Sequence, residues 1–302
     1  MAQSHHMTVE EWPRISLVMP NLNYAKFLGD AIESILSQGY PNLEFIMVDG
    51  GSNDGSLEII NRYQGSFSHT IIGPDEGQAD AINKGLEKAT GEISQWINSD
   101  DLLEPNALFS VARGIEGHDA VAGICTDFDP SGTESPVKLK RLSSRLMIRH
   151  PTKATFHQPA LWLRTEGVRD CGGIDSRLHY MFDYDLTVRY LDLFPRVRYI
   201  NSPLVRFRLH SRSKTTTSPT EFLRERREIV QKLAQNDSSR LRRSARRMVA
   251  RIDWWDRLTE IQNLPTSPYA RALLIVRETL HHPSARVGKG SARALYQLLT
   301  GP

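Results

Sequence analysis

The chain has 302 residues with the composition of an ordinary globular enzyme and a formal net charge of only +3 at pH 7. This length is ample for one large domain or for one domain with an appendage. Cys125 and Cys171 are too few for a disulfide framework or a cysteine metal cluster, which favours a reducing compartment. No run approaches the roughly 18 apolar residues of a membrane-spanning helix, and nothing resembles a signal peptide, so we expect a cytoplasmic protein.

The first elements of the chain follow a strand, helix, strand order. A compact apolar run at 15–19 predicts a strand that stops at Pro20. Apolar residues at helical spacing predict a helix over 28–36, and the run 43–48 predicts a second strand. Such a unit is right-handed and parallel, so its ligands bind at the carboxyl edge of the sheet.

Polar residues follow three successive predicted strands, at 43–48, 70–72 and 93–97. The acidic residues at these strand ends are Asp49, Asp75, Asp100 and Asp101. Because parallel strands share one carboxyl edge, these residues predict a polar crevice along it. The loops contain neither a GxGxxG fingerprint nor a Walker lysine, which argues against NAD and P-loop chemistry.

Asp100 and Asp101 are adjacent carboxylates directly after a buried strand. Their repulsion is relieved when a divalent cation or a hydroxyl-rich ligand lies between them. The pair therefore predicts a Mg²⁺ or Mn²⁺ site that grips a diphosphate. The alternative is that one of them only caps a helix that starts near Pro105.

The second half of the chain continues with strands, helices and one polar excursion. We expect strands at 120–124, 156–163, 197–200 and 205–209, and a helix that starts near Met181 and runs through Leu191. The polar, basic stretch at about 127–151 predicts an excursion that lies over the crevice on the acceptor side.

Helical spacing dominates from Pro219 onward, with crowded arginines. The basic residues are Arg240, Arg242, Arg243, Arg246, Arg247 and Arg251, and Trp254 and Trp255 follow them. This pattern is typical of a helix on anionic lipid at the inner face of a membrane, or of a helix packed on the main domain. The modest net charge argues against nucleic acid. We therefore divide the chain into an extension (1–13), a main domain (14–217) and a basic helical appendage (218–302).

Five motifs in one order resemble family 2 glycosyltransferases over roughly residues 14–217. They are SLVMPNLNY (16–24), VDGGSNDGS (48–56), GQADAINKG (77–85), NSDD (98–101), and GGID (172–175) with DYDL (183–186). The resemblance implies the GT-A fold, an α/β Rossmann-like, mainly parallel sheet flanked by helices. It implies metal-dependent inverting transfer, with Mn²⁺ or Mg²⁺, from a nucleotide-diphosphate sugar, UDP ahead of GDP or dTDP. The implied acceptor is a hydroxyl of a glycan, a lipid-linked or a small molecule, as in bacterial cell-surface or exopolysaccharide synthesis.

By the same resemblance, residues after the first three strands hold the nucleotide sugar. The expected donor-site residues are Pro20, Asn21, Asn23, Tyr24, Asp49, Gly51, Ser52, Asp75, Gln78, Asp80, Lys84 and Asp100. Asp49 is expected to accept from a uracil-like imide, while Tyr24 either stacks on the base or covers the core. Lys84 is either a ligand or a solvated helix residue. Asn83 is expected to cap or brace backbone.

The resemblance also assigns the metal and the catalytic base. Asp101 is expected to bind the metal and Asp100 the ribose or a metal-bound water, with the reverse assignment left open. His210 is either a further metal or phosphate ligand or a structural histidine. Asp183 is the expected general base, kept ionised by the positive end of its helix, while Asp185 is expected to pair with Arg189.

Two other functions are compatible with the same residues. One is a catalytically silent nucleotide-binding module whose basic tail recruits a partner. The other is a sugar nucleotidyltransferase, which usually needs a glycine-rich, basic loop after the first strand, and residues 20–24 do not provide one. The Phe182-Asp183 pair replaces the commoner Glu-Asp pair of the family and removes one acceptor contact.

Overall fold

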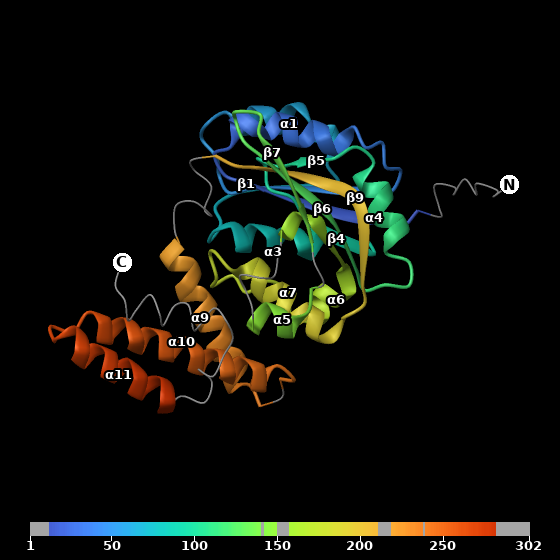
Figure 1. The fold of residues 1–302 in the computed structure, drawn as a ribbon. Coiled ribbons are helices and arrows are strands. Elements are labelled where there is room, and N and C mark those ends of the chain that lie inside the picture. The colour runs from blue at the N-terminus through green and yellow to red at the C-terminus, as the bar shows by residue number, and fades with distance from the viewer. Residues whose placement is uncertain (1–11, 140–141, 150–156, 211–218, 238, 282–302) are drawn as a thin grey trace. The chain divides into compact units, whose positions relative to one another are not determined.

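The computed structural model describes residues 12–139, 142–149, 157–210, 219–237 and 239–281 (Figure 1). The chain divides into two compact units, Met1–Phe222 and Leu223–Pro302. The division lies inside helix α9 (Pro219–Gln235), a few residues after the position that the sequence indicates.

The first unit begins with four parallel strands and the helices that connect them. The strands are β1 (Ile15–Asn21), β2 (Leu43–Asp49), β3 (His69–Ile72) and β4 (Ile93–Trp96), in the order β3-β2-β1-β4. The connections contain α1 (Ala25–Leu36), α2 (Ser56–Arg62), a short 3₁₀ helix (Gln64–Ser66) and α3 (Gln78–Lys88). Figure 1 shows α1 and α3 on opposite faces of the sheet. The expected parallel arrangement is confirmed for this half.

The sheet continues from β4 through mostly antiparallel strands, in the order β4-β8-β6-β9-β5, with β7 paired to β6. The strands are β5 (Leu102–Leu103), β6 (Ala120–Phe128), β7 (Glu134–Lys138), β8 (Leu161–Arg164) and β9 (Val197–Arg208). The helices are α4 (Ala107–Gly114), α5 (Ser144–Arg149), α6 (Thr165–Asp170), α7 (Phe182–Leu193) and a 3₁₀ turn (Gln158–Ala160). This mixed α/β sheet with surrounding helices confirms the expected fold class.

Three strand predictions differ from the structure. The strand expected at 156–163 is described from residue 157 onward, where the 3₁₀ turn Gln158–Ala160 precedes β8, which starts at Leu161. The two strands expected at 197–200 and 205–209 form one strand, β9, because register shifts against β6 between Ala122 and Cys125 accommodate the intervening residues. Strand β1 does not stop at Pro20 but runs to Asn21. Its pairing with β4 ends at Val18, and the N–H that Pro20 lacks would point to this unpaired side, so no ladder hydrogen bond is lost.

Packing between β1 and the neighbouring helices fixes the sheet edge that carries the polar loops. Every residue of β1 is buried. A Cβ atom added at Gly85 of α3 would lie 2.4 Å from Val18 Cγ1, so the glycine lets this helix approach the strand closely. The last turns of α3 therefore pack directly against β1.

The second unit contains α9 from Leu223 onward, α10 (Arg242–Gln262) and α11 (Pro268–His281). Trp254, Leu258, Ile261 and Ile275 form its buried core, and Trp255 packs against it. The expectation that the two tryptophans form an aromatic end for lipid contact is therefore wrong for Trp254, which is fully buried. Among the described helices, none combines the length and apolar character needed to cross a bilayer.

A buried carboxylate joins three segments at the opposite edge of the sheet. Glu44 on β2 accepts hydrogen bonds from Ser16 Oγ, from the backbone N–H and Oγ1 of Thr90, and from Arg14 Nη2 at 2.8 Å. Burial by itself would raise the pKa of Glu44, but these hydrogen bonds and the Arg14 charge outweigh it. The pKa of Glu44 therefore lies below its ordinary value of 4.5.

The Glu44→Gln variant is expected to lower the free energy of unfolding at neutral pH by about 1–3 kcal/mol, because it leaves buried donors mismatched. A carboxylate whose pKa is lowered by folding stabilises the folded state at pH values above its unfolded-state pKa. This stabilisation is lost as the pH falls through the folded-state pKa. The difference between variant and wild type should therefore shrink in acid. Urea titrations from pH 7 to pH 3 test this, with the exposed Glu87→Gln as control. A constant difference across that range contradicts the prediction.

Candidate active site

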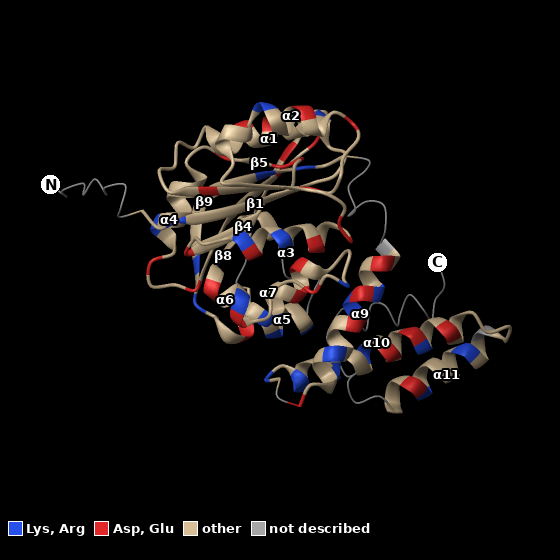
Figure 2. Cartoon of the chain, turned by 180° about the vertical axis from the view of Figure 1, so that it is seen from behind, with Lys and Arg blue, Asp and Glu red and all other residues tan. Residues whose placement is uncertain are grey.

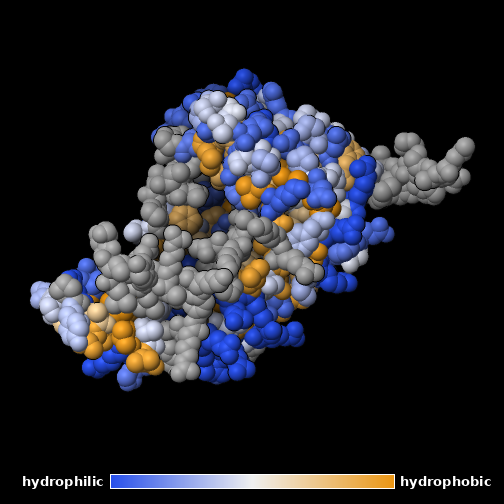
Figure 3. All heavy atoms as spheres, in the orientation of Figure 1, coloured by the Kyte–Doolittle hydropathy of each residue, from blue (hydrophilic) through white to orange (hydrophobic). Residues whose placement is uncertain are grey.

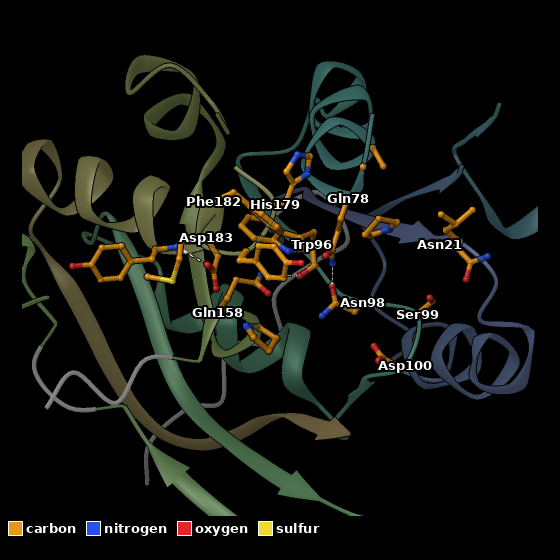
Figure 4. A pocket seen from close by; sticks show the side chains of 18 of the residues that line it. Asn21, Gln78, Trp96, Asn98, Ser99, Asp100, Gln158, His179, Phe182 and Asp183 are labelled. Carbon is orange, nitrogen blue, oxygen red and sulfur yellow. Dashed lines mark hydrogen bonds between the residues drawn. The ribbon is translucent and has the colours of Figure 1, made fainter. Parts of the chain in front are cut away.

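A cavity of about 610 Å³ opens at the carboxyl ends of the parallel strands (Figure 4). Seven of the expected site residues lie on its wall: Pro20, Asn21, Tyr24, Asp75, Gln78, Asp100 and Asp183. Eight lie outside the wall: Asn23, Asp49, Gly51, Ser52, Asp80, Lys84, Asp101 and His210. The structure thus brings residues from four separate motifs to one cavity and places the others in supporting positions.

Asp49 lies beneath the cavity as a fully buried loop anchor. Its Oδ1 accepts from the backbone N–H groups of Gly51 and Ser52, at 3.0 and 2.7 Å. Its Oδ2 accepts from Ser52 Oγ and from Asn21 Nδ2, at 2.8 and 2.7 Å. Both carboxylate oxygens are therefore engaged by the protein, and Gly51 and Ser52 serve to hold this loop.

From the sequence, Asp49 is expected to present a free acceptor atom to the cavity. In the structure Asn21 presents such an atom instead. Its amide nitrogen donates to Asp49, which fixes the orientation of the side chain. Its Oδ1 is buried and has no hydrogen-bond partner within the described chain, and the residue lies on the cavity wall. Asn23, with a left-handed backbone (φ 58°), instead clips the loop to its neighbour by accepting from Asn53 N at 2.9 Å.

The loop between β3 and α3 contributes Asp75 to the wall. A Cβ atom added at Gly50 would lie 2.5 Å from Asp75 Oδ2, so this carboxylate occupies the space that a side chain at position 50 would need. Asp80 and Lys84 pair with each other at 2.9 Å along α3, and Asp80 also accepts from the backbone of Glu76. The Lys84 hydrogen bond and the Glu76 N–H lower the pKa of Asp80, consistent with a helix-capping role.

Gln78 and Asn98 connect α3 to the loop after β4. Gln78 Nε2 donates to Asn98 Oδ1 at 2.7 Å (Figure 4), and Asn98 Nδ2 donates to Asp101 Oδ2 at 3.1 Å. Arg208 N donates to Asp101 Oδ1 at 3.0 Å. Asp101 is fully buried, and burial together with the neighbouring Asp100 carboxylate raises its pKa well above the ordinary value.

Asp100 is the carboxylate of the pair that reaches the cavity. Its Oδ2 lies 2.8 Å from His210 Nε2, and both side chains are partly accessible. His210 packs edge-on against Tyr24, with the ring centroids 5.9 Å apart. Asp100 and His210 thus form a hydrogen-bonded pair of ligand types that could hold a Mn²⁺ or Mg²⁺ ion, whereas both oxygens of Asp101 already accept from protein donors.

Asp183 enters the cavity from the other side, on the first turn of α7. Its Oδ1 accepts from Tyr184 N at 2.7 Å, and the adjacent Phe182 ring packs near Trp96 (Figure 4). Asp185 pairs with Arg189 on the same helix at 2.6 Å, which confirms the expected ion pair. Asp183 lies on the cavity wall, whereas Asp185 is turned toward Arg189.

The cavity also contains residues that the sequence did not mark. They include Trp96, Asn98, His157, Gln158, His179, Tyr180, Phe207 and Phe222. Gln158 is fixed by donating to Gln95 Oε1 at 2.6 Å and to Trp96 O at 3.0 Å. The position of Gln158 between a polar excursion and a buried strand could have indicated a cavity residue from the sequence. The aromatic residues of the wall have no such sequence context. Asn83 braces the backbone of Ile174, as expected.

A family model described as Glycosyl transferase family 2 matches residues 16–171, just over half of the chain. The chain belongs to this family. An uncharacterized glycosyltransferase from Nostoc sp. is 30% identical to this family 2 chain over 146 residues, 44% of the chain and 45% of the Nostoc protein. A PGL/p-HBAD biosynthesis glycosyltransferase from Mycobacterium tuberculosis is 29% identical over 185 residues, 59% of this chain and 69% of that protein. The chain thus spans less than half of the Nostoc protein.

Solved structures share the fold of this family 2 member at low sequence identity. S. aureus TarS 1-349, in complex with UDP-GlcNAc, has a TM-score of 0.63 at 16% identity, with 93% of this chain and 92% of TarS covered. The mannosyltransferase PcManGT from Pyrobaculum calidifontis, in complex with GDP-Man and Mn²⁺, has a TM-score of 0.57 at 18% identity, with 96% and 86% covered.

Proposed function

We propose that this family 2 member is a metal-dependent inverting glycosyltransferase that moves a sugar from a uridine diphosphate sugar to a hydroxyl acceptor. The observation that carries the proposal is the convergence on one cavity of Asn21, Asp100 with its neighbour His210, and Asp183. Base recognition, metal binding and proton abstraction each require one of these groups. The complexes of TarS with UDP-GlcNAc and of PcManGT with GDP-Man and Mn²⁺ support this class of donor and cofactor.

The donor base is proposed to bind at Asn21. The unpaired Oδ1 of Asn21 suits the N3–H donor of uracil, and the Asp49 hydrogen bond keeps the amide from turning over. Tyr24 and Pro20 lie on the same part of the wall and offer a flat surface to the ring. Asp49 then acts indirectly, by orienting Asn21 rather than by touching the base.

Asp100 and His210 are proposed to hold the metal, in preference to Asp101. The ion supplies charge neutralisation of the leaving diphosphate. Asp101 supports the site from below through its hydrogen bonds with Asn98 and Arg208. Gln78 and Asp75 lie beside this pair and are proposed to contact the ribose or the diphosphate.

Asp183 is proposed to take the proton of the acceptor hydroxyl as that oxygen attacks the anomeric carbon. The bond from the anomeric carbon to the diphosphate breaks on the opposite face, which inverts the centre. The position of Asp183 in the first turn of α7 favours its ionised form. Aromatic rings of Trp96, Phe182 and Tyr180 line the cavity, and such faces suit the packing of a sugar ring.

The Asp183→Asn variant is expected to lower the transfer rate by about 10²- to 10⁴-fold while nucleotide binding is kept, because the variant lacks only the proton acceptor. Asp100→Asn is expected to lower the affinity for UDP in the presence of Mn²⁺, with little effect in EDTA. Calorimetry with UDP and a Mn²⁺-dependent donor-hydrolysis assay measure the two effects, with the exposed Asp30→Asn as control.

Two outcomes contradict this assignment. Equal donor turnover in wild type and Asp183→Asn favours a catalytically silent nucleotide-binding module. Pyrophosphate release from a nucleoside triphosphate and a sugar phosphate favours a sugar nucleotidyltransferase instead.

A second measurement tests recognition of the base. UDP is expected to bind about tenfold or more tightly than CDP, because cytosine presents a lone pair at N3 to Asn21 Oδ1. In Asn21→Ala the ratio of the two dissociation constants should fall toward one. The assignment is wrong if CDP binds wild type as tightly as UDP, or if the ratio survives in the variant.

We also propose that the second unit contacts an anionic membrane through α11. Leu223–Pro302 carries 16 Lys and Arg residues against seven Asp and Glu, and Figure 2 shows both signs along its helices. One face of α11 exposes large apolar side chains, and Figure 3 shows apolar atoms at the surface over this helix. The exposed residues are Tyr269 (77%), Leu273 (56%), Val276 (47%) and Leu280 (72%). A basic unit with such a stripe suits the interface of an anionic bilayer.

Replacing Leu273 and Val276 together by Glu is expected to weaken binding to vesicles that contain an anionic phospholipid by at least about tenfold, because apolar contact is lost. Co-sedimentation at low and high salt measures this. Leu193→Glu is the matched control, since Leu193 is an equally exposed leucine (52%) in the first unit. If the double variant sediments with vesicles as wild type does, the proposal that α11 contacts the membrane is wrong.

A further inference from the structure

Three metal-ligating side chains converge next to the cavity, apart from Asp100 and His210. They are Cys125, Asp127 and His157, and one ligand atom of each lies within 4.8 Å of the others. Cys125 and Asp127 alternate along β6, so both side chains point to the same face of the sheet. His157 directly precedes the 3₁₀ turn Gln158–Ala160 and lies on the cavity wall.

The separation of Asp127 and His157 is too long for a hydrogen bond and slightly longer than that of two ligands of one ion. His157 Nδ1 lies 3.7 Å from Asp127 Oδ1, which is too long for a hydrogen bond. Donor atoms bound at about 2.0–2.2 Å in a tetrahedral site lie roughly 3.3–3.6 Å apart. A small shift of either side chain therefore brings both into bonding range of one cation.

One carboxylate oxygen of this cluster lacks a partner, whereas the Cys125 sulfur accepts one hydrogen bond, from the backbone N–H of Phe207. Asp127 Oδ1 is buried, and within the described chain it has no hydrogen-bond partner. Cys125 is fully buried with its sulfur on the same side, and it forms no disulfide. A buried carboxylate oxygen without a partner is costly, and a bound cation removes that cost.

We propose that Cys125, Asp127 and His157 bind a Zn²⁺ ion. A thiolate, an imidazole and a carboxylate form a donor set that suits zinc, whereas Mg²⁺ and Mn²⁺ prefer oxygen-rich sites such as the one proposed at Asp100. Three protein ligands leave a fourth position, and the location of His157 directs it toward the cavity. The ion joins β6 to the segment that leads into β8 and fixes the acceptor-side wall.

Cobalt is the probe for this site, because Co²⁺ occupies zinc sites and reports its ligands by colour. The full-length chain is treated with a chelator, exchanged into clean buffer and titrated with Co²⁺. Wild type is expected to bind one equivalent, with intense visible d–d bands and a sulfur-to-cobalt charge-transfer band in the near ultraviolet. Zn²⁺ should bleach both.

Cys125→Ser is expected to lose the charge-transfer band, whereas Cys171→Ser, which changes the other cysteine, keeps it. Asp127→Asn and His157→Gln are each expected to weaken Co²⁺ binding by at least about tenfold. Asp100→Asn should leave the band unchanged, because Asp100 belongs to the other metal pair. These readouts need no transferase activity, so they stand or fall separately from the proposed function.

The proposal is overturned if wild type shows no charge-transfer band, or if the band survives in Cys125→Ser and disappears in Cys171→Ser. It is also overturned if Asp127→Asn and His157→Gln both bind Co²⁺ as tightly as wild type does. Circular dichroism of each variant establishes its folding. If Cys125→Ser does not fold, the Asp127 and His157 variants decide the question.

Discussion

The architecture of the site depends on one buried carboxylate. Asp101 lies directly after the loop of β4, has no exposed surface, and accepts hydrogen bonds from Asn98 and from the backbone of Arg208. Arg208 Nε also donates to the carbonyl of Asp100 at 2.8 Å. Together these bonds tie the end of β9 to the end of β4. His210 follows two residues later and is brought to Asp100 by this connection.

The position of the site was predictable from the sequence, because it follows from strand order. Parallel strands deliver their carboxyl ends to one edge, and the acidic residues after β2, β3 and β4 mark that edge. Which of these side chains reach the cavity and which are buried supports was not predictable in the same way. Asp49 and Asp101 are both buried braces, while Asn21 and Asp100 reach the cavity, and only packing distinguishes the members of each pair.

The second half of the cavity depends on contacts between segments that are distant in sequence. His157 and Phe207 of the wall come from the segment before β8 and from β9, and the neighbouring Cys125 and Asp127 come from β6. No local spacing links these residues. They meet because β6 pairs with both β8 and β9, and β9 extends across a register shift that apolar patterning alone did not reveal. A short-range sequence pattern cannot predict contacts between such distant segments, whereas it does predict where the strands of a βαβ unit end.

The absence of a side chain at Gly50 constrains the residue that can stand at position 75 of the cavity wall. Since the carboxylate of Asp75 fills the volume above that backbone, a relative with a larger residue at position 50 must shorten or redirect the residue at position 75. The two positions should therefore substitute in concert across homologous chains. Their joint identity offers a compact marker for sorting relatives by how the acidic group is placed on the cavity wall.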